Sequence, residues 1–422
     1  QSTEPFNVME RRVVITGGAA ITPIGSSREA IVNSLTRGLS GVRRMKDDEL
    51  LVQHIHCKVF GTVSDPPAFD FARRDRKTMG PVAFYACQVV KEVIAQAGLS
   101  PEVLGSGRLG VAFGSTHGSP TVQRGIYETF FSKSQKRFAS IGAVDYLKSM
   151  VHTTAVNITK MFGITGRVIS SSTACTTSSQ SIGFGYEMIR FGRQDAMICG
   201  GADEYDTTTV AVFDNLLACS TAFNATPSRT PRPFDAERDG LVVGEGAGAV
   251  LLEDYDSARR RGADILGEVV GFGCNNNGGD LIFPNVDGIT ATLRIALEDA
   301  RLDSGDVDFI SAHATATKMG DVIEAQAIRK VFGERTPMVS GLKSYMGHTM
   351  GACGAIEAWL SLEMLREGWF APNHNLDTVD PECGSLDYLR GDGRTLDAEV
   401  VMSNNFAFGG INSVLVFKRY DG

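Results

Sequence analysis

The stretch ISSSTACTTSSQSIG, residues 169–183, runs from an expected strand through small residues and Cys175 into an expected helix. Short β-branched runs that end in Gly or Ser and lead into helical stretches are typical of an α/β fold. A cysteine at the start of a helix lies at the positive end of the helix dipole, which lowers the pKa of the thiol. The stretch therefore predicts an α/β fold and a nucleophilic Cys175. Taken alone, it also fits an unreactive buried cysteine.

The alternation of strands and helices runs through the chain twice, and the 47 glycines suit its many tight turns. No Pro-rich or Ser-rich linker separates the two cycles, so we expect two halves, residues 9–260 and 261–422, in one interlocked body. The first cycle has expected strands at 12–16, 109–113, 196–199 and 249–252, with helices at 28–37, 82–97 and 178–190. The second has expected strands at 265–271, 307–310, 338–340, 399–402 and 413–417, with a helix at 289–300.

Composition excludes several classes of protein. The 41 Lys and Arg against 49 Asp and Glu give a formal charge of −8, which argues against nucleic-acid binding. No apolar run is long enough for a transmembrane helix, and residues 1–18 lack the pattern of a secretory signal. Whether residues 1–8 are native is left open. The eight cysteines include no C-x-x-C pair, so we expect a cytoplasmic protein without a metal centre.

Two histidines lie in Gly-, Ala- and Thr-rich loops that follow expected strands. His313 lies in SAHATATKMGD (residues 311–321), and His348 lies in KSYMGHTMGACG (residues 343–354). A cysteine with histidine partners far away in sequence is a typical pairing of a nucleophile with its activating groups. The sequence therefore predicts a catalytic group of Cys175, His313 and His348.

These segments resemble, in order and spacing, those of the β-ketoacyl–acyl-carrier-protein synthases, decarboxylating condensing enzymes of the thiolase fold. The likeness runs from about residue 11 to residue 419 and includes TPRPFD (230–235), GEGAG (244–248) and SNNFAFGGIN (403–412). It implies two similar halves stacked as a five-layered αβαβα sandwich and an acyltransferase that needs no cofactor. The Cys-His-His set resembles the elongating enzymes, because the initiating enzymes use Cys-His-Asn.

The resemblance also implies a role for each residue of the site. Cys175 attacks an acyl thioester and holds the chain, while His313 and His348 stabilise the enolate that forms when malonyl-carrier protein loses CO2. The backbone amides of Cys175 and Phe408 form a second oxyanion hole, and Gly409 gives the Phe408 gate its freedom.

Further residues are expected around this group. Lys343 lies near the histidines, with Glu357 behind it, and Thr315 and Thr317 belong to the same outer network. Two alternatives stay open: Lys343 serves only as a buried ion-pair partner, or Glu357 is mainly architectural.

Three positions depart from the family pattern. The family usually has H-G-T-x-T, whereas Ala314 and Ala316 follow His313 here; the extra methyl group at each position is tolerated only if the φ angle is negative. His117 stands where relatives have Gly or an aliphatic residue lining the acyl tunnel at a subunit interface, so we expect it to shape that tunnel. The alternative is a loop histidine that faces solvent.

Acyl carrier proteins are acidic, so an acidic enzyme needs a local basic surface to meet one. The alternative is that the clustered charges are only a solvated face. The partners implied are acyl- and malonyl-loaded carrier proteins and a second subunit, either identical or a related ketosynthase-like chain. The residues expected to dock the carrier are Arg73, Arg74, Lys77, Lys136 and Arg137.

Two other functions are weighed against an elongating synthase of fatty-acid or type II polyketide or polyene biosynthesis. A non-decarboxylating thiolase would need a second catalytic cysteine in the late Gly-rich loop, where this chain has Phe408; Cys353 is a weak substitute. A chain-length-factor-like subunit shapes the tunnel without catalysis, but such subunits replace the nucleophilic cysteine. The length of the acyl chain and the primer are left open.

Overall fold

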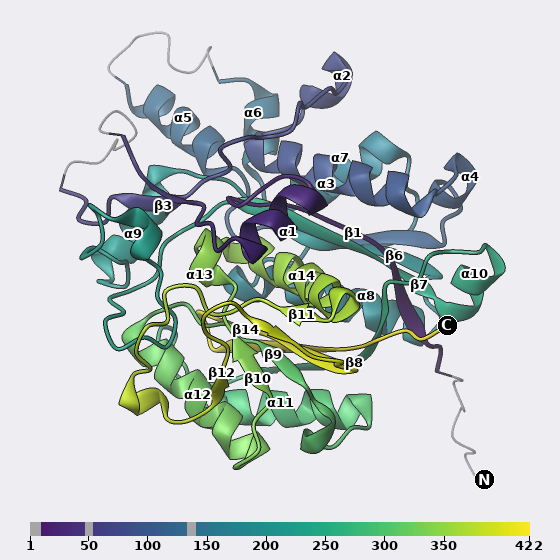
Figure 1. Ribbon diagram of the computed structural model, residues 1–422. Helices are drawn as coiled ribbons and strands as arrows, with labels where there is room; N and C mark the ends of the chain where they lie inside the picture. The colour runs from purple at the N-terminus through teal and green to yellow at the C-terminus, as the bar shows by residue number, and fades with distance from the viewer. Residues whose placement is uncertain (1–9, 47–53, 133–140) are drawn as a thin grey trace.

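The computed structural model describes residues 10–46, 54–132 and 141–422 (Figure 1). One mixed sheet has eleven strands in the order β12-β10-β9-β14-β15-β8-β1-β7-β6-β4-β5. Its strands are β1 (Val13–Ile21), β4 (Leu109–Gly114), β5 (Val168–Ile169), β6 (Ala196–Asp203), β7 (Gly246–Asp254), β8 (Gly267–Asn276), β9 (Phe309–Ser311), β10 (Met338–Ser340), β12 (Asp387–Tyr388), β14 (Val400–Ala407) and β15 (Ile411–Lys418). Two small sheets pair β2 (Val42–Arg44) with β3 (Val59–Gly61), and β11 (Trp369–Phe370) with β13 (Arg394–Thr395).

The large sheet consists of two halves with one topology. The first half has the order β5-β4-β6-β7-β1, and the second has β10-β9-β14-β15-β8 with β12 added at its edge. In each half the first strand of the chain lies at one edge and the third at the other. The halves meet where β1 and β8 pair antiparallel, with Val13 opposite Val269. The two similar halves expected from the sequence are confirmed, and their exact division after residue 260 stays a prediction.

Helices cover both halves and also fill the space between them (Figure 1). The central layer is α8 (Thr177–Arg190) and α14 (Cys353–Glu367), which contact each other and strands of both halves. Helices α3 (Pro81–Ala97) and α7 (Thr153–Phe162) pack on the outer face of the first half, and α11 (Val286–Ala300) lies on β8 with α12 (Lys318–Phe332) beside it. This is the predicted five-layered αβαβα arrangement of the thiolase fold.

The two central helices pack closely because glycines remove side chains where they meet other elements. A Cβ on Gly183 of α8 would lie 2.3 Å from the ring of Phe272, and one on Gly354 of α14 would lie 2.6 Å from the amide nitrogen of Ser179. Every residue of α14 from Cys353 to Leu365 is buried. The close approach brings the N-termini of both helices together in the middle of the molecule.

The other helices lie around this framework: α1 (Arg28–Thr36), α2 (Arg73–Arg76), α4 (Pro101–Leu104), α5 (Pro120–Phe131), α6 (Ala143–Ser149), α9 (Thr207–Asn215), α10 (Tyr255–Arg260) and α13 (Lys343–Met346). Within the described ranges, none of the helices has both the length and the apolar character needed to cross a membrane.

Candidate active site

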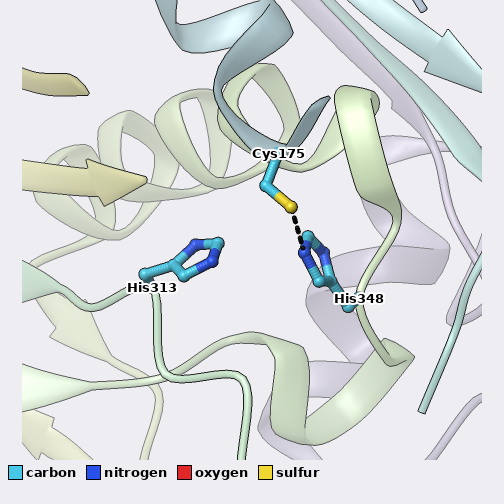
Figure 2. Close-up of side chains that lie close together, drawn as sticks. All are labelled: Cys175, His313 and His348. Carbon is cyan, nitrogen blue, oxygen red and sulfur yellow. Dashed lines mark hydrogen bonds between the residues drawn. The ribbon is translucent and has the colours of Figure 1, made fainter. Parts of the chain in front are cut away.

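Cys175, His313 and His348 come together where the central helices begin (Figure 2). Cys175 lies in a single 3-10 turn, Ala174–Thr176, directly before α8, and is only 6% exposed. The Nε2 atom of His348 lies 3.0 Å from the Sγ atom of Cys175. The rings of His313 and His348 are nearly perpendicular, with centroids 5.2 Å apart. Cys175 thus forms one compact group with two histidines that follow it by 138 and 173 positions in sequence.

A backbone amide sets the tautomer of His348. The N–H of Met350 donates to Nδ1 of His348 at 3.2 Å, so Nδ1 is an acceptor and the ring proton lies on Nε2. Burial, and after it the charge of Lys343, lower the pKa of His348 well below its ordinary value, which keeps the ring neutral. His348 therefore directs an N–H donor at Cys175.

The same tautomer bears on metal binding. One ligand atom from each of Cys175, His313 and His348 lies within 4.8 Å of the others, which is close enough for a metal site. A metal ion would need the Nε2 lone pair of His348, but that atom carries the proton. The arrangement suits hydrogen bonding at this position better than metal coordination.

The expected lowering of the Cys175 pKa is wrong for the resting site. Burial raises the pKa of the thiol to about 12, and the charge of Lys343 offsets this only in part. Loss of water around a buried thiolate therefore outweighs the favourable place at the start of α8. Formation of the thiolate during the reaction therefore depends on the hydrogen-bond donors around Cys175.

Lys343 and Glu357 form a buried ion pair beside the histidines. Lys343 Nζ lies 2.5 Å from Glu357 Oε1, and both side chains are almost wholly buried. Asn405 donates to the other carboxylate oxygen at 2.8 Å. Burial, Lys343 and His348, in that order, lower the pKa of His313. Lys343 is thus an ion-pair partner and also a source of positive charge for the site.

The His313 loop differs from the expectation. Ala314 and Ala316 have φ angles of 39° and 66°, so the condition of negative φ that the sequence set for these alanines is not met. Glu324 of α12 holds the loop by accepting from the amides of His313 and Ala314, each at 2.8 Å. Asp321 accepts from the amide of Ala316 at 3.0 Å. These hydrogen bonds maintain a backbone conformation that alanine disfavours.

Asp321 and Glu324 were not among the site residues predicted from the sequence, although both lie close after His313. Asp321 lies three residues after Lys318, the first residue of α12, and Glu324 lies eleven residues after His313. Both are therefore on the first turns of α12, beneath the loop. An acidic residue that follows such a loop at helical spacing is the signal that could have identified them.

A cavity of about 390 Å³ opens beside the catalytic group. Cys175, His313 and His348 line it together with Thr315 and Thr317, whose hydroxyl oxygens lie 3.0 Å apart. We expected the two threonines in an outer network, but the structure places them on the cavity wall. They lie there because the loop turns outward after His313, toward the start of α12.

Phe408 lies at the same cavity and is 37% exposed. Its ring stacks on that of Phe213 in α9, with centroids 5.6 Å apart. Gly409 has a φ angle of 86°, and its N–H donates to the carbonyl of Leu281 at 2.8 Å. Phe408 therefore occupies the place expected of a gate. Phe213 was missed because nothing near it in sequence points to the site.

The remaining predicted residues lie away from this group. His117 is exposed in the single chain and lies outside the set of described residues that line the cavity. Arg73, Arg74 and Lys77 are exposed on and beside α2. Lys136 and Arg137 lie outside the described residues. The tunnel and docking roles stay predictions.

Comparison with known proteins agrees with this geometry. The family models for the beta-ketoacyl synthase N-terminal and C-terminal domains match residues 10–258 and 266–377. The chain is 35% identical to 3-oxoacyl-[acyl-carrier-protein] synthase 1 of Haemophilus influenzae, over 98% of this chain and 100% of that protein. The corresponding synthase of Escherichia coli is 34% identical, over 97% and 99%.

Solved structures give the same result. A beta-ketoacyl synthase from Burkholderia phymatum superposes with a TM-score of 0.93 at 45% identity, covering 97% of this chain and 100% of that one. A structure described as the ishigamide ketosynthase/chain length factor gives a TM-score of 0.89 at 30% identity, covering 97% and 100%. A type II polyketide-synthase ketosynthase in complex with its acyl-carrier protein gives 0.88 at 27%, covering 98% and 100%. With the family models matched across both halves, this chain belongs to the beta-ketoacyl synthase family.

Proposed function

We propose that this protein is an elongating 3-oxoacyl-acyl-carrier-protein synthase that condenses an acyl chain held on Cys175 with malonyl-acyl carrier protein. The products are β-ketoacyl-acyl carrier protein and CO2. The observation that carries the proposal is the 3.0 Å contact between Cys175 Sγ and an Nε2 donor of His348 whose tautomer is set by the Met350 amide.

The first step loads Cys175. Its sulfur attacks the carbonyl carbon of the acyl thioester, the new S–C bond forms, and the bond to the carrier thiol breaks as the thiol proton passes to that leaving group. The backbone amides of Cys175 and Phe408 are proposed as the donors for the oxyanion of this step. Cys175 lies at the start of α8, where the helix dipole favours negative charge.

The second step uses the histidines. The bond between the α-carbon and the carboxylate of the malonyl group breaks, CO2 leaves, and the electron pair forms an enolate whose oxygen accepts hydrogen bonds from His313 and His348. The α-carbon then attacks the acyl group on Cys175, a C–C bond forms, and the S–C bond breaks. The released thiolate accepts a hydrogen bond from the Nε2–H of His348, and a proton from solvent water then restores the thiol. Neutral histidines suit this step because they donate without gaining a proton.

Pathway and assembly extend the proposal. Fatty-acid and type II polyketide or polyene biosynthesis use the same condensation, and the relatives above include a 3-oxoacyl-[acyl-carrier-protein] synthase and a type II polyketide-synthase ketosynthase. The second subunit is either a copy of this chain or a related subunit, as in the ketosynthase/chain-length-factor structure. A cytoplasmic location is part of the proposal, because all eight cysteines are free thiols, which suits a reducing compartment.

The test is condensation itself. The enzyme is incubated with malonyl-carrier protein and acyl-carrier proteins of varied length, and the products are identified by mass. We expect β-ketoacyl-carrier protein from the parent and none from Cys175→Ala. Cys383→Ala removes another buried thiol and is the matched control, expected to retain activity. Condensation by Cys175→Ala would contradict the mechanism, and a parent that takes no acyl group on Cys175 would favour the non-catalytic subunit.

A further inference from the structure

Asp203 is a buried carboxylate that none of the steps above uses. It is the last residue of β6 and is 4% exposed. Its Oδ2 atom accepts from the N–H of Gly351 at 2.6 Å and from the hydroxyl of Thr116 at 2.7 Å. Its Oδ1 atom accepts from the N–H of Thr116 at 3.0 Å. Three donors from two loops therefore converge on one side chain.

One of these loops is the turn that orients His348. In that turn two successive backbone amides act together: the N–H of Met350 donates to Nδ1 of His348, and the N–H of Gly351 donates to Asp203. Met350 has a φ angle of 53°, an unfavourable value for its side chain that the surrounding contacts must maintain. Asp203 thus holds the amide next to the one that selects the tautomer.

The turn has little room to move. A Cβ on Gly351 would lie 2.8 Å from Asp203 Oδ2, and a Cβ on Gly201 would lie 2.6 Å from the carbonyl oxygen of Gly351. The backbone at Gly351 is therefore packed against the end of β6, at Gly201 and at the Asp203 carboxylate. A change at Asp203 acts directly on the His348 turn, because Asp203 accepts from Gly351 and the neighbouring amide of Met350 donates to His348.

The second loop leads toward the nucleophile. Thr116 follows β4, and its carbonyl accepts from the hydroxyl of Ser172 at 3.4 Å, three residues before Cys175. Asp203 therefore connects the His348 turn with the segment that carries the thiol. Burial also raises the pKa of Asp203 to about 7.

We propose that Asp203 is a positioning residue that keeps the Nε2–H of His348 directed at Cys175 through its hydrogen bond to Gly351. This role rests on the proposed condensing function. Aspartate suits this place because each of its oxygens accepts from a backbone N–H, that of Thr116 and that of Gly351. An asparagine in this place would present an NH2 group to at least one of them, which leaves two donors opposed.

Glu204 provides a matched control. It is the next residue, is 6% exposed, and accepts from the amides of Val82 and Thr121 and the hydroxyl of Ser119 at the start of α3 and α5. Glu204→Gln makes the same chemical change to a neighbouring buried carboxylate that holds other elements. Asp203→Asn and Glu204→Gln are both expected to lose stability, but only Asp203→Asn should change the tautomer of His348.

The experiment compares Asp203→Asn and Glu204→Gln with the parent enzyme. We expect kcat for condensation to fall about 100-fold in Asp203→Asn, with KM for malonyl-carrier protein little changed, as for a reacting group displaced by roughly 1 Å. Nitrogen-15 NMR of the histidines should show His348 protonated at Nε2 in the parent and Glu204→Gln, and a mixture of tautomers in Asp203→Asn. If Asp203→Asn does not fold, Thr116→Val takes its place in the experiment. It removes one donor to Asp203 and should give a smaller loss of kcat.

Two results would overturn the inference: an unchanged His348 tautomer in Asp203→Asn, or a loss of kcat no larger than that of Glu204→Gln. A parent enzyme that forms no β-ketoacyl product would instead refute the proposed function. In that case the tautomer comparison still decides the role of Asp203, because the NMR measurement needs no substrate.

Discussion

Lys343 and Glu357 face each other across 2.5 Å at the back of the active site, and neither side chain has more than 2% of its surface exposed. A buried ion pair stabilises a fold less than its geometry suggests, because both charges lose their water. Removing one partner is more damaging, since the other charge is then left alone. We therefore predict that mutations of these two residues have strongly non-additive effects on the free energy of unfolding.

Lys343→Met should lower the free energy of unfolding by about 3–5 kcal/mol, because Glu357 remains buried without its cation. The double variant Lys343→Met with Glu357→Gln should recover most of this loss, measured by chemical denaturation. It should stay poorly active, because the histidines have lost the nearby positive charge. Additive losses in the double variant would show that the two side chains do not interact as the structure indicates.

The left-handed backbone at Ala314 is tied to the glycine opposite it. A Cβ on Gly341 would lie 2.6 Å from the Cβ of Ala314, so Gly341→Ala should destabilise the protein by about 1–3 kcal/mol through overpacking. Adding Ala314→Gly removes the opposing methyl group and puts glycine, which tolerates positive φ, at this position. The second change should therefore restore stability. Thermal melts of the two single variants and the double variant measure this. Failure of the second change to rescue the first would contradict the predicted contact.

The buried carboxyls of α12 should contribute a loss of stability as pH rises from about 4 to 7. Burial raises the pKa of Glu324 to about 7 and that of Asp321 to about 6. At these two carboxyls the folded protein holds protons that the unfolded chain has already released, so each contributes a loss of stability as pH rises through this window. The lowered pKa values of His313 and His348 act in the opposite direction, so the carboxyl contribution is measured as a difference between two proteins. Denaturation at several pH values should show Glu324→Gln gaining stability relative to the parent as pH rises. A difference that does not change with pH would be incompatible with a raised pKa at Glu324.

The stacking of Phe408 on Phe213 predicts that α9 controls access to the thiol. Phe213→Ala should free Phe408 and speed alkylation of Cys175 by iodoacetamide, read by mass spectrometry of the intact protein. Phe130→Ala, at an exposed aromatic of α5, is the control and should leave the rate unchanged. Equal rates in the parent and Phe213→Ala would show that the stack does not restrict the cavity.

Docking of an acidic carrier protein on α2 is testable through charge. Arg74 is exposed, and Arg74→Glu should weaken carrier binding at low salt, with the difference from the parent shrinking as salt rises. Arg390→Glu reverses an exposed charge elsewhere in the chain and serves as the control. Carrier affinity that is the same for the parent and Arg74→Glu at low salt would reject the proposed surface.

Local sequence patterns were sufficient for much of the structure. The helix expected at residues 82–97 is α3, and the strand expected at 338–340 is β10, because apolar periodicity and flanking Pro, Gly and Ser mark such elements within a few residues. Cys175, His313 and His348 were found in the same way, since each lies in a distinctive loop between a strand and a helix.

Tertiary structure decided the pKa values, the hydrogen bonds and the backbone conformation of those residues. The raised pKa of the Cys175 thiol depends on burial beneath elements from both halves, and the positive φ angles of Ala314 and Ala316 depend on hydrogen bonds to α12. Asp203 reaches the His348 turn only because β6 ends beside it. The sequence by itself determined the order of the elements and the catalytic residue types, because these are properties of short segments. Solvent exclusion and hydrogen bonds between distant segments come from packing, so protonation, tautomer and strain could be read only from the folded chain.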